Sequence, residues 1–253
     1  MLPHSEDYWY ADPLMWEQDG KEVVFLERVD RKTGIGCIAC ADITDGSWKE
    51  PVPVIEEPYH MSFPMCFYWG NELYMIPETE MNQSINLYRC TEFPYQWEKA
   101  GEFMKGWHLV DSVVWSKDEN RVQILASEYD PENDFYTRYH AYELHRRGDQ
   151  IENADLGRIS DSYTLMSRMA GPVIEEDIPL APVQRSTSGI YGYSVQFRKK
   201  DKKVPGEQIK ELLPTDFHNM GHKLLGVHTY SQSTHYEMID IQYLVYNRNK
   251  WRK

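Results

Sequence analysis

The sequence predicts an all-β fold, and three observations support this prediction. A hairpin of two apolar strands recurs along the chain, helix-length amphipathic stretches are few, and aromatic residues, which favour strands, make up 13% of the chain. The hairpin returns roughly every 50 residues, a period typical of β-propeller blades. One meander cannot bury both of its faces, so we expect a five-bladed β-propeller with four-stranded blades, forming a single domain over residues 1–253. A β-sandwich of irregular hairpins is the alternative.

Three stretches carry the repeat most clearly: DPLMWEQDGKEVVFLE from Asp12, FPMCFYWGNELYMIPE from Phe63, and DSVVWSKDENRVQILASE from Asp111. Each begins with an apolar strand that ends in an aromatic residue, and each then passes through a polar turn. Each returns as a second apolar strand that closes on a glutamate. These closing residues are Glu27, Glu78 and Glu128.

Two further copies of the repeat are weaker. AGPVIEEDIPLAPVQ ends on Gln184, which occupies the closing position of a fourth hairpin, and YGYSVQFRK supplies the following strand. A fifth copy begins near FHNMGHKLLGVHTY and continues into HYEMIDIQYLVYN. These stretches complete the predicted ring of five blades.

Polar residues at equivalent places in the blades are expected to meet at the axis, because the innermost strand of each blade lines the central channel. One group lies near the blade starts: Asp12, Phe63 with Ser62 beside it, Asp111, Arg168 and His218. The other group lies at the closing positions: Glu27, Glu78, Glu128, Gln184 and His228. The alternative reading is that the glutamates only satisfy exposed strand ends.

Several carboxylates around one pocket are what glycoside hydrolysis requires, because one acid protonates the leaving oxygen while an ionised partner activates water or attacks the sugar. Asp12, before the rigid Pro13, is the candidate base, and Asp111 would orient the sugar or tune its neighbour. Glu78, beside Pro77, is the candidate acid, with Glu128 second. Ser62, Glu27, Glu128, Arg168, Gln184, His218 and His228 are the candidate substrate-binding residues.

Composition and motifs exclude several other classes. The net charge of −13, from 27 basic and 40 acidic residues, argues against nucleic acid or an anionic membrane as partner. The chain has no P-loop, no GxGxxG and no GxSxG, and it has no apolar run long enough to span a membrane. The N-terminus lacks a secretion signal, so a cytoplasmic location is expected. The oligomeric state is not indicated.

The four cysteines are expected to be structural. Cys37 and Cys40 have the CxxC spacing, but they fall in GCIACADI, which reads as a strand. Residues three apart on a strand point to opposite faces, so the two thiols should not converge on a metal.

Several motifs together resemble a known family: YWYADP, the stretch from HMSFPMCFYWGNELYMIPETEMNQ to PYQWE, LVDSVVW, SRMAGPV and GVHTYSQSTHYEMID. This family is the five-bladed propeller domain related to family 43 glycoside hydrolases. It is similar to the N-terminal region of plant glucosamine inositolphosphorylceramide transferases. The resemblance covers about residues 8–242.

The resemblance implies an aspartate base in the first blade, which Asp12 matches. It also implies a second aspartate, in a later blade, that tunes the pKa of its neighbour, and Asp111 could match this one. It also implies an acid in a Glu-Gly-Pro stretch, where this chain has Ala170-Gly171-Pro172. Glu78 or Glu128 would then take the role of the acid, or the chemistry would differ, or the pocket would only bind. No cofactor is expected, although the resemblance allows an axial calcium. The predicted function is glycosidic bond cleavage, and the alternative is a non-catalytic carbohydrate-binding or accessory propeller associated with glycosyl transfer.

Overall fold

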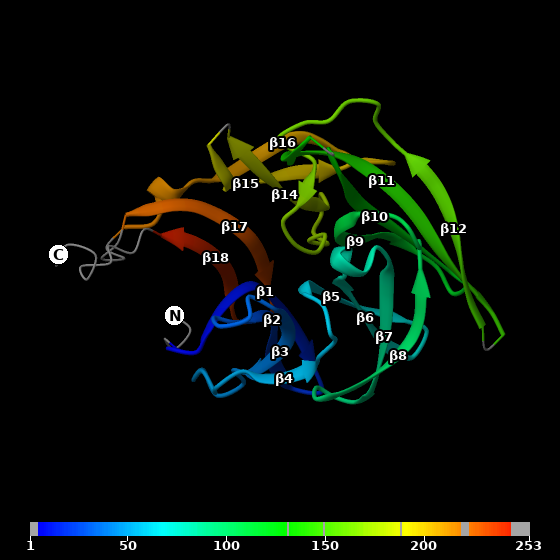
Figure 1. Ribbon diagram of the computed structural model, residues 1–253, viewed down its shortest axis with the longest axis horizontal. Coiled ribbons are helices and arrows are strands. Elements are labelled where there is room, and N and C mark those ends of the chain that lie inside the picture. Colours follow the sequence, from blue (N-terminus) through cyan, green and yellow to red (C-terminus); the bar gives the residue numbers. More distant parts are fainter. Residues whose placement is uncertain (1–4, 131, 149, 188, 219–222, 244–253) are drawn as a thin grey trace.

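The computed structural model describes residues 5–130, 132–148, 150–187, 189–218 and 223–243. These residues form 18 strands and two short 3₁₀ helices, Glu80–Asn82 and Pro214–Asp216. The strands surround a central axis as separate antiparallel sheets (Figure 1). No helix in the described part of the chain combines the length and the apolar character needed to cross a bilayer.

Four of the sheets are meanders of four consecutive strands. The first blade holds β1 (Tyr8–Gln18), β2 (Lys21–Asp30), β3 (Gly36–Asp42) and β4 (Val52–Ile55). The second holds β5 (Ser62–Trp69), β6 (Glu72–Glu78), β7 (Ile85–Glu92) and β8 (Gln96–Phe103). The third holds β9 (Leu109–Lys117), β10 (Arg121–Asp130), β11 (Asn133–Arg147) and β12 (Gln150–Arg158). The fourth holds β13 (Arg168–Met169), β14 (Leu180–Thr187), β15 (Ile190–Lys200) and β16 (Pro205–Leu212).

The fifth sheet is smaller than the sequence predicted. Within the described residues it contains only β17 (Leu224–Gln232) and β18 (Glu237–Tyr243). The all-β propeller is therefore confirmed, but the prediction of five four-stranded blades was wrong in its count. The structure has four complete blades, and a two-stranded sheet stands between the fourth blade and the first (Figure 1).

The hairpins predicted from the repeat are the first two strands of the first three blades. In the first blade Gln18 pairs with Lys21 across the turn Asp19-Gly20, whose φ angles are both positive. Primed two-residue turns of this kind match the right-handed twist of paired strands. In the second blade Trp69 pairs with Glu72 across Gly70-Asn71.

The core lies between neighbouring blades, because β2, β6 and β10 are covered on both faces. The first and second blades share a cluster that includes Phe25, Met75 and Tyr88, all at most 3% exposed. The second and third blades share another around Trp69 and Tyr142. Burial on two faces explains why these strands read as nearly continuous apolar runs rather than as alternating patterns.

The expectation of buried cysteines holds for two of the four, because Cys37 and Cys90 are only half-buried. Cys40 and Cys66 are buried in the cluster between the first and second blades. Burial raises the pKa of the Cys66 thiol well above its ordinary value, which keeps that thiol protonated and unreactive.

The two ends of the described chain close the ring. The Ser231 hydroxyl on β17 donates to the carbonyl oxygen of Pro13 at 2.8 Å and accepts from the amide of Met15 at 3.1 Å. In the turn before β18, the Ser233 hydroxyl donates to Glu22 at 2.6 Å. Side-chain hydrogen bonds therefore fasten the two-stranded sheet to the first blade.

Candidate functional site

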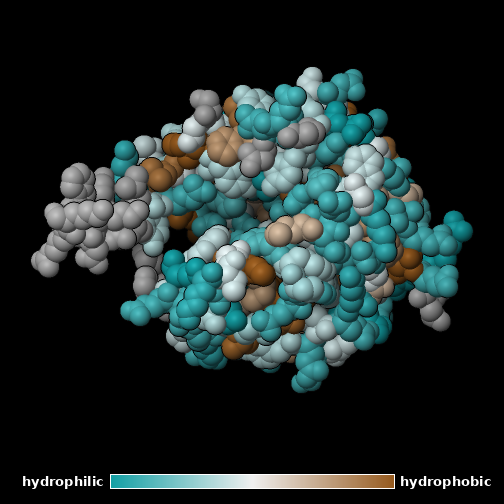
Figure 2. Space-filling model, viewed as in Figure 1, coloured by the Kyte–Doolittle hydropathy of each residue, from teal (hydrophilic) through white to brown (hydrophobic). Residues whose placement is uncertain are grey.

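Many of the predicted site residues gather at one cavity on the axis, with a volume of about 1340 Å³. In Figure 2 this face of the molecule is hollowed near its centre, where hydrophilic residues surround the opening. Six residues expected from the sequence line the cavity: Asp12, Glu27, Ser62, Glu78, Arg168 and His228. Asp111, another predicted residue, does not line the cavity itself. It is buried behind the wall and contacts Arg168, which does line it.

The first residue of each clear repeat has an unusual backbone. Asp12, Phe63 and Asp111 have φ angles of 47°, 44° and 49°. Each lies at a register shift in the pairing of its strand, which is the mark of a β-bulge. A left-handed residue costs about 1–2 kcal/mol outside glycine. The recurrence of this conformation at the axis in three blades re-aims each side chain relative to a regular strand.

Asp12 is held by the backbone of one neighbouring blade and by the fifth sheet. The amide of Phe63 donates to Asp12 Oδ2 at 3.3 Å, and the amide of Asp12 donates to Asp240 Oδ2 at 3.3 Å. Its side chain is only 6% exposed. The position of this carboxylate is therefore fixed by three separate sheets.

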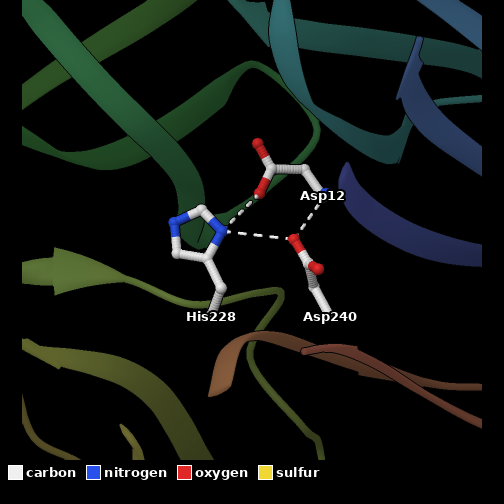
Figure 3. A group of neighbouring side chains, drawn as sticks. All are labelled: Asp12, His228 and Asp240. Atoms are coloured by element: carbon white, nitrogen blue, oxygen red, sulfur yellow. Dashed lines mark hydrogen bonds and ion pairs between the residues drawn. The ribbon is translucent and has the colours of Figure 1, made fainter. Parts of the chain in front are cut away.

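An imidazole lies between two aspartates in this cavity (Figure 3). His228 Nδ1 lies 3.2 Å from Asp12 Oδ1 and 3.3 Å from Asp240 Oδ2. Burial disfavours the charged ring, but Asp12 and Asp240 outweigh that effect and raise the pKa of His228 to about 10. His228 is therefore an imidazolium at neutral pH, and it balances part of the negative charge of the two carboxylates.

These three residues are also the candidate metal ligands within the described chain, because their ligand atoms lie within 4.8 Å of one another. Calcium takes six to eight oxygen ligands, whereas this group offers two carboxylates and one nitrogen. The donor set therefore does not fit a calcium ion held by protein side chains.

A second charged group surrounds Arg168. Its Nε donates to Asp111 Oδ2 at 2.5 Å, its Nη1 donates to the Tyr129 hydroxyl at 3.0 Å, and its Nη2 lies 3.6 Å from Glu78 Oε2. The guanidinium also stacks 4.8 Å from the centre of the Tyr191 ring. Burial opposes the charge on Arg168, but Asp111 outweighs it, so the pKa of Arg168 is raised and the side chain remains a cation.

Two glutamates of the cavity are poised to hold protons. Burial, reinforced by the charge of Asp111, raises the pKa of Glu78 well above its usual range, and Arg168 only partly opposes this. Burial also raises the pKa of Glu27 to about 7. The hydrogen bond to His60 lowers this pKa, and the negative charge of Asp12 raises it further. Glu78 therefore holds its proton to a higher pH than an ordinary glutamate does, and Glu27 exchanges its proton near pH 7.

His60 fixes the position of Glu27. Its Nε2 lies 2.9 Å from Glu27 Oε1, and its Nδ1 accepts a hydrogen bond from the amide of Gly36 at 3.0 Å. Because Nδ1 accepts, the ring proton is assigned to Nε2 and faces the glutamate. A Cβ on Gly36 would lie 2.8 Å from the Met61 carbonyl oxygen and 2.9 Å from His60 Cε1, so only glycine fits there.

Three predicted residues lie away from the cavity. Glu128 pairs with Leu109, whereas Glu27 and Glu78 pair with the residues directly before Asp12 and Phe63. Ser127 therefore takes the equivalent place in the third blade, and a shift of one residue turns Glu128 to the other face. There it contacts Arg138 at 3.0 Å and Arg158 at 2.8 Å.

Gln184 and His218 complete this group. Gln184 pairs with Arg168 in the expected register, but its amide donates to the Met169 carbonyl oxygen at 2.9 Å. His218 is exposed after the second 3₁₀ helix. Neither residue lines the cavity.

The cavity residues that sequence reasoning missed include four that contact or neighbour the charged groups: His60, Tyr129, Tyr191 and Asp240. Tyr129 directly follows Glu128, and His60 stands two residues before Ser62, so both lay beside positions that the repeat had marked. Asp240 belongs to YEMID, one of the motifs that carry the family resemblance. Tyr191 begins YGYSVQFRK, which predicted a strand but marked none of its residues as part of the site.

Fold and cavity together define a β-propeller protein with an axial cavity that gathers carboxylates, an arginine and histidines. The chain belongs to the family described as glucosamine inositolphosphorylceramide transferase 1, N-terminal, whose model matches residues 4–139. The glucosamine inositolphosphorylceramide transferase 1 of Oryza sativa subsp. indica is 34% identical over 213 residues, covering 80% of this chain and 27% of the relative. The protein of that name from Arabidopsis thaliana is 35% identical over 106 residues, covering 41% of this chain and 14% of the relative. The chain thus spans about a quarter or less of these relatives.

Solved structures with a similar fold include proteins that are named as glycosidases or phosphorylases. The α-L-arabinofuranosidase PaAbf62A of Podospora anserina matches with a TM-score of 0.58 and 9% identity, covering 87% of this chain and 76% of that structure. The β-1,2-mannobiose phosphorylase of Listeria innocua matches with a TM-score of 0.57 and 12% identity, covering 96% and 89%. At these identities the likeness concerns the fold alone. It does not single out family 43.

Proposed function

We propose that this chain binds a carbohydrate in the axial cavity and cleaves a glycosidic bond there. The observation that carries the proposal is the presence of two different carboxyl groups in one cavity: Glu78, whose pKa is raised by burial, and Asp12, whose Oδ1 lies 3.2 Å from Nδ1 of His228. Two carboxyl groups whose environments separate their protonation states are the arrangement that acid–base cleavage requires.

In this reaction Glu78 donates its proton to the glycosidic oxygen, and Asp12 accepts a proton from the attacking water. The Arg168 cation lies 3.6 Å from Glu78 and stabilises the glutamate once it has lost the proton. The Ser62 hydroxyl, buried at the cavity wall, is available to a sugar hydroxyl. Glu27, whose pKa is about 7, is the second candidate donor.

The fourth blade has Ala170 where the family resemblance implies a glutamic acid, so the proton donor must come from another blade, as Glu78 does. Ala170 is fully buried in the core between the fourth blade and the fifth sheet. Its amide donates to the Pro182 carbonyl oxygen, and its own carbonyl oxygen accepts from the amide of Tyr230 at 2.7 Å. That segment therefore contributes packing to the fold and no carboxyl group to the cavity.

A sugar-binding propeller without catalysis is the second candidate. One observation favours it: the two aspartates expected to act in catalysis are each paired with a cation, Asp12 with His228 and Asp111 with Arg168. The relatives carry transferase names, and most of their length lies outside the region that matches this chain. Under this hypothesis the chain would hold a glycan beside a separate glycosyl-transfer domain.

The test is glycan hydrolysis, measured as the release of reducing ends, together with calorimetric binding of the same glycans. Glutamine is uncharged, like a protonated glutamic acid, but it cannot donate a proton to the leaving oxygen. The Glu78→Gln variant should therefore fold and bind glycans, while its rate of reducing-end release falls about 100-fold or more. Asp12→Asn and Glu27→Gln identify the base and the competing donor. Glu80→Gln, outside the cavity, is the matched control. Binding by the wild type without any release would reject cleavage and leave the sugar-binding alternative.

A further inference from the structure

The cavity is larger than one sugar ring requires. Ligand pockets for drug-sized molecules are about 300–1,000 Å³, whereas this cavity measures about 1340 Å³. Besides the carboxylates at the axis, its lining includes a group of side chains from β1, from the loop that follows β3, and from β18 with the turn before it. We call this part the side cleft, and it is lined by Tyr8, Trp9, Tyr10, Trp48, Tyr236 and Met238.

The side cleft lies where the two-stranded sheet meets the first blade. Among the described residues β17 is the only strand that pairs with β18, so β18 faces β1 directly and not through further strands. The turn that joins β17 to β18 is anchored on the first blade, because Glu22 accepts from the Ser233 hydroxyl at 2.6 Å and from the amide of His235 at 3.3 Å. Both walls of the cleft are therefore held in place.

The lining combines aromatic rings with hydrogen-bonding groups. Trp9 is 42% exposed and Tyr236 is 36% exposed. The Tyr10 hydroxyl, by contrast, is held by Glu50 at 3.0 Å. Arg31, whose Nε donates to the Tyr8 carbonyl oxygen, and Gln242 add polar atoms to the same lining.

This chemistry matches a sugar ring, whose flat C–H face packs on an aromatic side chain while its hydroxyls form hydrogen bonds at the edge. A lipid chain would gain nothing from the polar atoms that alternate with the rings, and burying them unpaired would cost free energy. The cleft is also continuous with the axial carboxylates, since a single cavity includes both. A ligand in one part can therefore extend into the other.

We propose that the side cleft binds the second and later residues of an oligosaccharide whose terminal residue lies among the axial carboxylates. The substrate class is then a glycan chain of at least two residues, with Trp9 as a stacking platform. This inference rests on the proposed function, because it requires the axial cavity to hold a sugar.

Calorimetric titration of wild-type protein tests the proposal. The probes are four monosaccharides (glucose, galactose, mannose and glucosamine), their di- and trisaccharides, and the octyl glycosides of the same sugars. We expect the best disaccharide to bind about tenfold or more tightly than its monosaccharide. Trp9→Ala should remove that gain and leave monosaccharide affinity within about twofold, while Trp9→Phe, which keeps an aromatic ring, should restore most of it.

Tyr95→Ala is the matched control, because Tyr95 is 46% exposed in the turn between β7 and β8 and does not line the cavity. It should leave every affinity unchanged. Monosaccharide binding with no gain from a second residue would overturn the side-cleft proposal and leave the proposed function standing. The side-cleft proposal is also overturned if Trp9→Ala weakens mono- and disaccharides equally, or if the octyl glycoside outcompetes the disaccharide. Failure of every saccharide to bind would overturn the proposed function, and this inference with it.

Discussion

Asp12 and His228 lie at opposite ends of the sequence, yet their side chains meet at 3.2 Å in the centre of the fold. Asp12 belongs to the first blade and His228 to the two-stranded sheet, so the pair joins the two ends of the propeller. Asp240, 3.3 Å from the same ring nitrogen, completes the group (Figure 3).

Replacing His228 by glutamine should destabilise the protein and change its pH dependence. Two largely buried carboxylates would lose their cation, at a cost of about 3 kcal/mol. The folded protein holds the His228 proton up to about pH 10, whereas the unfolded chain releases it near pH 6.5. The contribution of this proton to stability is therefore complete below pH 6.5 and is lost as pH rises to 10. Urea unfolding of both proteins at pH 6, 8 and 10 measures it. A difference in unfolding free energy that stays constant across this range would contradict the assignment.

Glu27 should change stability in the same direction as His228 when pH rises, but over a lower pH range. Its pKa is about 7 in the folded state, above the ordinary value of a glutamate, so the folded protein binds the extra proton. Its stabilising effect is complete below about pH 4.3 and disappears as pH rises through 7. Glu27→Gln should therefore be most stable, relative to wild type, above pH 7. Carbon-13 NMR of the glutamate carboxyls reports the pKa directly, and a midpoint near 4.3 would refute the prediction.

Gly36→Ala tests the position of the Glu27–His60 pair. The added Cβ would lie within 3.0 Å of Met61, His60 and Glu27, and we expect a loss of about 1–3 kcal/mol with weaker carbohydrate binding. Gly189→Ala is the control, because no atom lies within 4 Å of the Cβ that alanine would add there. Thermal unfolding and calorimetry measure both effects. Equal behaviour of the two variants would mean that the close approach at Gly36 is relieved without cost.

Glu128 should contribute to acid resistance and not to ligand binding. Burial works against its charge, but Arg158 and Arg138 outweigh it and lower the pKa of Glu128 to about 2. The stabilisation is present above the unfolded pKa of about 4.3 and is lost as pH falls toward 2. Glu128→Gln should cost about 1–2 kcal/mol at pH 7, a figure reduced for the exposure of Arg158, and should converge with wild type near pH 2. Unchanged carbohydrate affinity in this variant would confirm that Glu128 acts outside the cavity.

The sequence predicted the blades best where both strands of a hairpin carried a strong pattern. The repeats that start at Asp12, Phe63 and Asp111 are real hairpins, because their apolar runs and polar turns suffice to specify local pairing. The fifth repeat was weaker, and its described part holds only β17 and β18. The count of complete blades therefore could not be predicted from spacing alone.

The residues of the site were predictable only where a residue's position in the repeat determines which way its side chain faces. Glu27 and Glu78 face the cavity because their register relative to the left-handed residues is the same. Glu128 does not, because its strand is paired one residue differently, and no local signal marks that difference. His60 and Tyr191 come from a loop and from the start of a third strand, so their approach to the axis depends on how whole blades pack.

The ring closure between β17 and the first blade has a consequence for synthesis on the ribosome. Asp12 emerges with the first blade, but its counter-charge His228 and its amide partner Asp240 are among the last described residues to be translated. Until β17 and β18 have been translated, Asp12 lacks both the cation and the carboxylate that contact it in the finished fold. A chain that stalls before β17 therefore carries the four complete blades and an incomplete cavity.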